Sequence, residues 1–292
     1  MKAEPAVWAP ALLGDRPRRL SLQSGDVGEY VIRGGRLGYE RLQLLARQWM
    51  PTTTELLGRV GLKPGAHCLD VGCGGGEVTF EIARLVGPEG HVTGLDMDEV
   101  KLALGREAGE RRGVTNVDFR VADVSQWNEK DAYDLVYARF LLQHLTQPLD
   151  LLRAMWAAVR PAGVLLVEDA DFEAMFCDPP DEGFEFWKRS YSRVLELRGG
   201  DPVIGRKLHR YFREAGVPSP TMSVVQLANT TGEAKTLPLS TLEASREAIL
   251  AEGVATEGEL TTALARLASF AADPETTSGS PRVFQVWASR PI

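Results

Sequence analysis

The feature that most constrains the fold is a glycine-rich turn at residues 70–76, which reads Asp-Val-Gly-Cys-Gly-Gly-Gly. The apolar run His67–Val71 leads into this turn and predicts a buried strand, while Val78, Ile82 and Val86 follow it at helical spacing. Glycine is favoured where the backbone turns sharply and a ligand approaches closely. Open α/β sheets bind ligands where a strand ends in such a turn, so the pattern predicts a ligand site here.

Strand and helix patterns alternate along the chain beyond this turn. Four further strands are predicted at His91–Leu95, Val117–Val121, Tyr133–Ala138 and Val164–Val167, with helices between most of them. These strands are mostly unbroken apolar runs, which indicates that both faces of the sheet are buried. Strands that alternate with helices predict a parallel sheet covered by helices on both faces.

The two ends of the chain follow other patterns. A helix is predicted from Tyr39 to Met50, with Pro51 ending it and a second helix running to about Val60. After Phe172 the chain turns mostly helical, and two late strands, at residues 221–227 and 283–287, are expected to join the same sheet. The predicted fold is a Rossmann-like, seven-stranded, mostly parallel sheet with its last strand antiparallel, an N-terminal helical lid and a helical insert after the fifth strand.

Length and charge narrow the class of protein. A chain of 292 residues with 33 basic and 40 acidic residues, net charge −7, fits one large domain with an elaborated lid. Its basic residues are scattered, which argues against a nucleic-acid partner. It has no apolar run of about 18 residues, which argues against a membrane span. Cys68, Cys73 and Cys177 show no C-x-x-C spacing, and the N-terminus lacks the apolar core of a signal peptide, so a cytoplasmic protein with reduced thiols is expected.

The glycine pattern disfavours a dinucleotide. A nicotinamide dinucleotide site needs G-x-G-x-x-G, and the third glycine would fall at Glu77 or Thr79. A glutamate facing a pyrophosphate would also be unfavourable. A glycine-rich turn without any ligand remains the plain alternative.

The residues from about Thr54 to Asp169 resemble the class I, Rossmann-like S-adenosylmethionine-dependent methyltransferase superfamily, small-molecule type. The resemblance implies that the cofactor is S-adenosylmethionine, with S-adenosylhomocysteine as its product. It also implies that Gly72, Gly74 and Gly76 pack against the methionine part and ribose of the cofactor. The predicted units are then residues 1–52 (tail and lid), 53–171 (cofactor-binding core) and 172–292 (substrate-covering helices and the last two strands).

Acidic residues stand at three successive strand ends. The resemblance implies that Asp70 organises the turn and the cofactor amino group. It also implies that Asp96 binds the ribose hydroxyls and that Met97 covers one face of the adenine. Asp123, followed by Val124, would lie near the adenine amino group. Carboxylates accept strong hydrogen bonds from such hydroxyl and amino groups. The alternative for Asp96 and Asp123 is a solvated residue at a strand end.

Four more residues are candidates around the reacting groups. By resemblance, Arg139 lines the methionine end of the cofactor. His144 is the first candidate for a general base because its unperturbed pKa lies near neutrality, against the alternative of a capping or packing histidine. Tyr30 is expected to close the site and is the second candidate base. Arg33 is expected to pair with the cofactor carboxylate. The alternative is that the segment with both residues is only a surface turn.

Motifs of other methyltransferase classes are missing. An N-P-P-Y-like motif would follow the fourth strand, where this chain has Ala138-Arg139-Phe140-Leu141, and it has no Pro-Cys pair. These absences disfavour a nucleic-acid substrate. Glu168, Asp169 and Asp171 cluster after the fifth strand and could hold a metal or a substrate amine. A polar rim is the preferred interpretation, so no metal is predicted.

The insert after the fifth strand is rich in aromatic residues, and this composition predicts the chemical class of the acceptor. Phe172, Phe176, Trp187 and Tyr191 are the candidates for a substrate cover that favours a flat or hydrophobic molecule and excludes water. Plain core packing is an equally good explanation of these residues.

The sequence therefore predicts a methyltransferase that acts by in-line displacement on an O, N or C atom of a small, aromatic or hydrophobic metabolite. Secondary metabolism is the expected setting. A homodimer is compatible with the sequence. Two alternatives stay open: a protein or peptide methyltransferase, and a cofactor-binding catalyst that transfers no methyl group.

Overall fold

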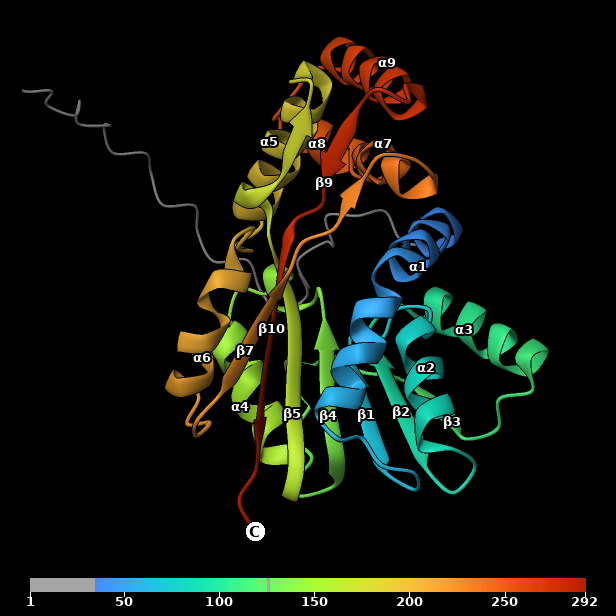
Figure 1. Cartoon of the computed structure of the whole chain (residues 1–292), viewed down its shortest axis with the longest axis vertical. Helices are drawn as coiled ribbons and strands as arrows, with labels where there is room; N and C mark the ends of the chain where they lie inside the picture. The colour runs from blue at the N-terminus through green and yellow to red at the C-terminus, as the bar shows by residue number, and fades with distance from the viewer. Residues whose placement is uncertain (1–34, 125–126) are drawn as a thin grey trace, which may run out of the picture.

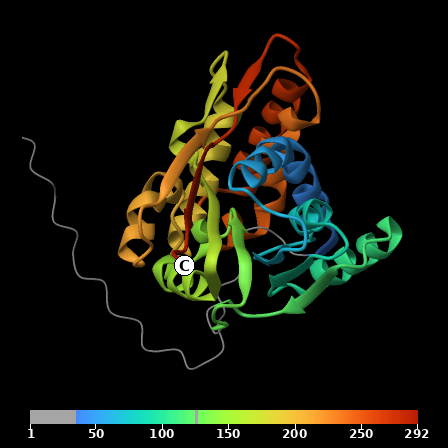
Figure 2. The same cartoon turned by 60° about the horizontal axis from the view of Figure 1, so that its bottom comes forward.

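The computed structural model describes residues 35–124 and 127–292 of the chain, and side chains from residue 38 onward. These residues form a seven-stranded sheet with the order β3-β2-β1-β4-β5-β10-β7, and Figures 1 and 2 show β3 and β7 at its two ends. Its strands are β1 (His67–Val71), β2 (His91–Asp96), β3 (Val117–Val121), β4 (Tyr133–Arg139), β5 (Val159–Asp171), β7 (Thr221–Val225) and β10 (Arg282–Ser289).

The strand directions agree with the predicted fold. β1 to β5 pair in parallel, whereas β10 runs antiparallel to both of its neighbours, β5 and β7. Asp70 pairs with Gly94 of β2 and with Tyr137 of β4, and Asp96 pairs with Val121 of β3. The carboxyl ends of β1 to β4 therefore lie at one edge of the sheet, where the glycine turn and the strand-end acids come together.

Helices cover both faces of this sheet. α2 (Glu77–Val86) and the second half of α1 (Gly35–Arg59) lie on one face, and α4 (Pro148–Ala158) and α6 (Leu208–Glu214) lie on the other. α3 (Glu99–Arg112) packs beside β3. Residues of β1 alternate between the two sides, since Leu69 packs with the α4 side and Cys68 with the α2 side.

A helical cover stands above the carboxyl edge of the sheet. It consists of α5 (Glu182–Leu197), α7 (Leu237–Ala244), α8 (Arg246–Ala251) and α9 (Glu257–Ala272), which Figure 1 draws in yellow to red at the top of the molecule. Phe184, Trp187, Ile249 and Leu260 belong to an apolar cluster separate from those beside the sheet. The insert thus has its own core, which fits the predicted cover. The predicted boundary at residue 172 stays a prediction.

Pro51 does not end the first helix, contrary to the sequence-based expectation. α1 runs from Gly35 through Pro51 to Arg59, and Figure 1 shows it bending along its length. Proline removes the helical N–H donor that would bond the Arg47 carbonyl, so the helix loses one hydrogen bond at this point. Trp49, Leu56 and other residues on both sides of the proline are buried, so tertiary packing keeps the helix continuous.

Three further details differ from the predicted elements. Val100, Leu104 and Ala108 have the spacing of a buried helical face in the sequence, but α3 buries Leu102 and leaves Val100 55% exposed. The sequence predicts one helix at about residues 241–252, but the structure has two there, α7 and α8, which meet at Ser245. A small second sheet, formed by β6 (Phe176–Asp178), β8 (Ala228–Asn229) and β9 (Thr277–Gly279), was not predicted because its strands are too short to show a pattern.

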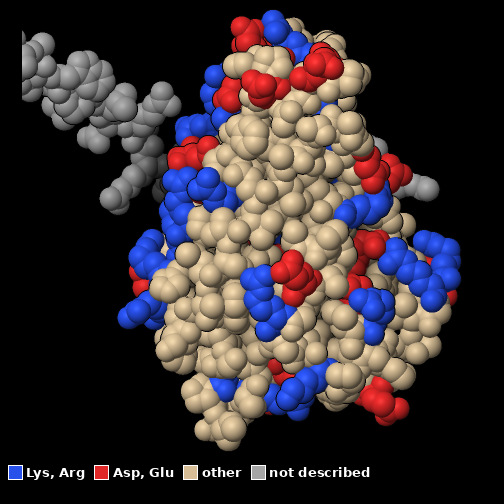
Figure 3. Space-filling model, viewed as in Figure 1, with Lys and Arg blue, Asp and Glu red and all other residues tan. Residues whose placement is uncertain are grey.

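The surface and the helices bear on possible partners. On the face shown in Figure 3, Lys and Arg side chains are interspersed with Asp and Glu and form no continuous basic strip. Within residues 35–124 and 127–292, no helix has both the length and the apolar character needed to cross a membrane.

Candidate functional site

A cavity of about 1180 Å³ lies at the carboxyl edge of the sheet, beneath the helical cover. Single small-molecule sites usually enclose about 300–1,000 Å³, so this cavity has room for two ligands together. Its wall is formed by the β1–α2 turn, the ends of β2 and β4, the 3-10 helix η1 (Leu142–His144), α1, α5 and α8.

The glycine turn forms one part of the wall. Gly72 (φ 71°) and Gly74 (φ 56°) have left-handed backbones and line the cavity, together with Cys73 and Gly75. Gly76 (φ 84°) does not line it. A Cβ at Gly76 would lie 2.3 Å from the Phe119 ring, so this glycine permits close packing of α2 against β3.

Asp96 connects the glycine turn to the end of β2. One carboxylate oxygen accepts a hydrogen bond from the Gly74 amide at 2.8 Å, and the other accepts one from the Asp98 amide at 2.9 Å. A carboxylate oxygen can accept more than one hydrogen bond, so Asp96 retains acceptor capacity toward the cavity that it lines.

Asp70 lies at the base of the turn and is almost fully buried. The Thr79 hydroxyl donates a hydrogen bond to it at 2.7 Å. Burial raises the pKa of Asp70 to about 6, although the Thr79 bond and the Arg139 charge act in the opposite direction. A cationic group bound beside Asp70 would stabilise its ionised form.

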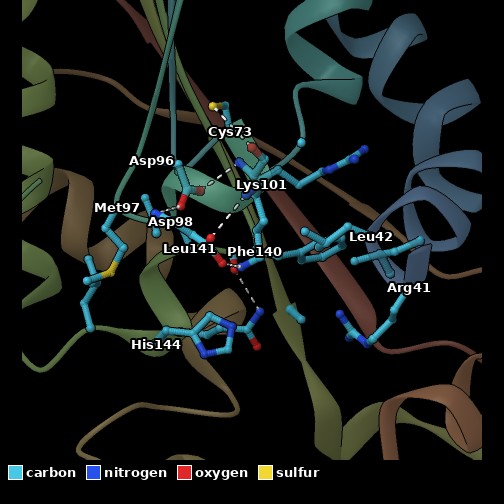
Figure 4. A pocket seen from close by; sticks show the side chains of 18 of the residues that line it. Arg41, Leu42, Cys73, Asp96, Met97, Asp98, Lys101, Phe140, Leu141 and His144 are labelled. Atoms are coloured by element: carbon cyan, nitrogen blue, oxygen red, sulfur yellow. Dashed lines mark hydrogen bonds and ion pairs between the residues drawn. The ribbon is translucent and has the colours of Figure 1, made fainter. Parts of the chain in front are cut away.

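The remaining predicted adenosine contacts lie in the same wall. Met97, half of whose surface is exposed, lines the cavity together with Asp123 and Val124. Lys101 forms an ion pair with Asp98 at 3.2 Å beside them, as Figure 4 shows. This end of the cavity is therefore rich in carboxylates. Glu77 lines it as well, at a position where a dinucleotide fingerprint requires glycine.

Arg139 lies at the end of β4 and belongs to a buried network. It donates to the Thr53 hydroxyl at 3.0 Å, and Thr53 donates to Glu168 at 2.8 Å. Glu168 also accepts hydrogen bonds from Tyr137 at 2.6 Å and from Gln285 at 2.9 Å. The network joins α1 to the sheet and holds Arg139 in the cavity wall.

His144 lies at the far end of the cavity from the glycine turn. Figure 4 shows its ring opposite Cys73 and Asp96. Burial lowers the pKa of His144 to about 3, and the charges of Arg41 and Lys101 act in the same direction. The imidazole is therefore neutral at neutral pH and is a weaker base than an ordinary histidine.

The aromatic candidates of the insert divide into two groups. Phe172 and Tyr191 line the cavity, with their ring centroids 5.1 Å apart. Trp187 packs against Phe184 inside the cover, and Phe176 lies on β6 with 45% of its surface exposed, so neither lines the cavity. Phe172 and Tyr191 fit the predicted acceptor cover, Trp187 fits the alternative of core packing, and the half-exposed Phe176 fits neither.

Two groups of candidates fall outside this wall. Tyr30 and Arg33 lie outside the described residues. Glu168, Asp169 and Asp171 are each buried with separate hydrogen-bond partners, for example Arg206 on Asp171 at 2.6 Å. In the part of the chain that the structure describes, no group of three or more His, Cys, Asp or Glu residues could hold a metal ion.

Several cavity residues were not singled out as site residues. Leu42 and Trp49 were expected only as the apolar face of a helix, and that face lines the cavity. Arg41 of the same helix and Ala248 of α8 gave no separate signal, because their role depends on how α1 and the cover meet the sheet. Gln143 of η1 stood out in the sequence only as the partner of His144 in a Gln-His pair.

A model of methyltransferase domains matches residues 62–216 of this chain, which is more than half of its length. The chain belongs to the methyltransferase-domain family. It is of the class I, S-adenosylmethionine-dependent type that the glycine turn and the strand-end acids indicated.

Two curated relatives are ubiquinone and menaquinone enzymes by name. The chain is 37% identical over 125 residues to the ubiquinone/menaquinone biosynthesis C-methyltransferase UbiE of Ectopseudomonas mendocina, covering 42% of this chain and 48% of the relative. It is 32% identical over 168 residues to the demethylmenaquinone methyltransferase of Listeria welshimeri, covering 57% of this chain and 65% of the relative. The match thus spans about half to two thirds of each relative.

Solved methyltransferase structures share the fold at low identity. A candidate methyltransferase of Bacillus halodurans has a TM-score of 0.55 and 17% identity, covering 82% of this chain and 98% of the other. Phosphoethanolamine N-methyltransferase 2 of Haemonchus contortus, solved with S-adenosylmethionine, has a TM-score of 0.51 and 17% identity. The match covers 87% of this chain and 52% of the other.

Proposed function

We propose that this chain binds S-adenosylmethionine at the carboxylate-rich end of the cavity and catalyses transfer of its methyl group to a small aromatic or hydrophobic acceptor at the other end. The observation that supports this most is the single cavity, which extends from the glycine turn and Asp96 to the helical cover at Phe172 and Tyr191.

The first end of the cavity suits an adenosyl-sulfur ligand. Asp96 would accept hydrogen bonds from the ribose hydroxyls, and Asp123 would lie near the adenine amino group. Asp70 would stabilise the ammonium group, and Arg139 would pair with the carboxylate. A pyrophosphate would instead face Glu77, Asp96 and Asp98, whose negative charges would repel it.

The second end suits a neutral, flat acceptor. Phe172, Tyr191 and Leu195 line it, and Trp49 with Phe140 form an edge-to-face pair at 5.9 Å. When bound, the cofactor supplies a methyl group on a sulfonium, which is open to in-line attack. These apolar walls would exclude water and align the attacking atom, an effect that can contribute roughly 7–11 kcal/mol in favourable cases.

His144 is the residue of this chain proposed to take a proton from the acceptor. It is neutral over the physiological pH range because burial lowers its pKa to about 3. Such a weak base is sufficient only where the attacking group becomes strongly acidic as its bond to the methyl group forms. A carbon or amine acceptor can begin the attack without losing a proton first, so it fits a base of this strength. Cys73 is no competitor as a nucleophile, since burial raises the pKa of its thiol well above the ordinary value.

The names of the relatives support an acceptor of quinone type. UbiE and the demethylmenaquinone methyltransferase are named for methylation in quinone biosynthesis, and a ring of that kind matches the aromatic cover. We therefore place hydroxylated aromatic rings first among the acceptors to be tested.

The test is a screen of such acceptors, scored by release of S-adenosylhomocysteine, together with calorimetry. We expect Asp96→Ala to weaken S-adenosylhomocysteine binding more than tenfold, because removing one partner of charged hydrogen bonds costs about 1.5–3 kcal/mol. Asp118→Ala, which removes a half-exposed carboxylate from β3 beside Arg120, is the matched control and should bind normally. Normal binding by Asp96→Ala would remove this residue from the site.

A further inference from the structure

We propose that Gln143 selects the acceptor by accepting a hydrogen bond from a hydroxyl or N–H group of that molecule. This inference rests on the proposed function, because it concerns the acceptor end of the same cavity. Gln143 lies in η1, lines the cavity and is only 3% exposed.

The side-chain oxygen of Gln143 carries the inference. The amide nitrogen donates to the Phe140 carbonyl at 3.3 Å, which determines where the oxygen lies. That oxygen is shielded from solvent and has no hydrogen-bond partner among the residues that the structure describes. Buried polar atoms almost always have a partner, so an orphaned acceptor in a cavity wall points to a donor on the ligand.

The backbone around Gln143 is fixed from both sides. Its amide donates to Asp169 at 3.2 Å, and its carbonyl accepts from the Asp201 amide at 2.8 Å. A Cβ at Gly200 would come within 2.4 Å of the same carbonyl, so the neighbouring loop is pressed closely against η1. The backbone of Gln143 is thus held in place before any ligand binds, and its side chain starts from a fixed point in the cavity wall.

The position in the cavity assigns this oxygen to the acceptor. Its sequence neighbour His144 lies opposite Asp96 and Cys73 in Figure 4, away from the carboxylates that suit the cofactor's own donors. Phe172, Tyr191 and Leu195 line the cavity at the acceptor end. In a cavity that excludes water, one unmet hydrogen bond discriminates strongly between otherwise similar ligands.

The chemistry of an amide limits what Gln143 can do. A carboxamide oxygen accepts a hydrogen bond but takes up no proton near neutral pH, so Gln143 orients the acceptor and leaves proton transfer to another group. It is therefore a specificity-determining residue, and its removal should affect acceptor binding more than cofactor binding.

The experiment measures probe binding to the protein loaded with S-adenosylhomocysteine. Calorimetry compares a naphthol, the corresponding naphthylamine and the methyl ether of the same naphthol, which differ in the presence and kind of donor. We expect the wild type to prefer naphthol or naphthylamine over the ether by roughly tenfold to a hundredfold. The stronger of the two shows whether O–H or N–H is the preferred donor. Gln143→Met should abolish the preference.

Two further variants make the test decisive. Gln143→Asn keeps an amide but withdraws its oxygen by one methylene, and it should lose the preference as well. Gln147→Met changes an exposed glutamine next to η1 and should keep it. The inference would be overturned if Gln143→Met or Gln143→Asn kept the preference. It would also be overturned if the wild type bound all three probes equally or bound none of them. Failure of the proposed function would appear separately, as loss of S-adenosylhomocysteine binding by the wild type.

Discussion

At the scale of single residues, buried carboxyl groups dominate the electrostatics of this molecule. Burial raises the pKa of Asp70 to about 6 and that of Asp169 to about 7, above the value near 3.9 that an exposed aspartate shows. A raised pKa means that the folded state favours the protonated form. The contribution of these groups to ligand-free stability is therefore complete below pH 4 or so and is lost as pH rises through about 6 to 7.

Ligand binding should show the opposite dependence on pH. If the cofactor ammonium lies beside Asp70, binding requires the ionised carboxylate, so S-adenosylhomocysteine affinity should rise with pH through about 6 and then level off. Calorimetry should find wild-type affinity roughly tenfold weaker at pH 5 than at pH 7. Asp70→Asn should bind weakly with no such dependence, and Asp118→Asn should behave as the wild type. A flat wild-type profile would separate Asp70 from the ammonium group.

At the scale of elements, α1 determines how the cavity is closed. Its first half contacts both the glycine turn and the cover: Tyr39 packs on Gly75, and Arg41 donates to Thr241 at 3.0 Å. Its second half packs against α2, with Leu56 and Leu57 in the core. The same helix therefore joins the two ends of the cavity.

A methyl group added at Gly75 should disturb this arrangement. Its Cβ would lie 2.2 Å from the Tyr39 ring, so α1 or the turn would have to shift. We expect Gly75→Ala to reduce the free energy of unfolding by about 1–3 kcal/mol and to weaken S-adenosylhomocysteine binding, measured by denaturant titration and calorimetry. Gly58→Ala is the matched control, because a Cβ at this exposed helical position meets nothing within 4 Å. That change should add up to about 1 kcal/mol. Equal behaviour of the two variants would contradict the contact.

Local patterns predicted those elements whose ends are marked by local chemistry. β1 and β3 have the predicted bounds, and α2 ends at Val86 before Gly87, as the sequence indicated. Pro51 misled the prediction because Trp49 and Leu56, on either side of it, are buried and tertiary packing keeps the helix continuous. No local pattern could separate Tyr191, in the cavity wall, from Trp187 on the same helix, because both are aromatic and buried.

The cofactor end was easier to predict from the sequence than the acceptor end. Asp70, Asp96 and Asp123 follow parallel strands, whose carboxyl ends must lie at one edge of the sheet, so strand order alone brings them together. Gln143 and Arg41 line the same cavity only because α1, η1 and the cover pack together. Long-range packing of that kind leaves no trace in a short stretch of sequence.

At the scale of the whole molecule, a parallel sheet and a separate helical cover enclose one cavity with two chemically different ends. The sheet edge supplies carboxylates and glycine backbone, and the cover supplies aromatic and aliphatic side chains. Under the proposed function, the charged cofactor and an apolar acceptor would bind to different parts of the fold. The central claim is that the sheet edge is shaped for an adenosyl-sulfur ligand and against a pyrophosphate.

The most direct measurement of that claim is calorimetry of the wild-type protein with S-adenosylhomocysteine and, separately, with NAD. The account predicts saturable binding of S-adenosylhomocysteine with one molecule per chain, and no binding of NAD at the same concentrations. The account would be contradicted if NAD bound more tightly than S-adenosylhomocysteine. It would also be contradicted if S-adenosylhomocysteine gave no detectable heat of binding and displaced no bound ligand.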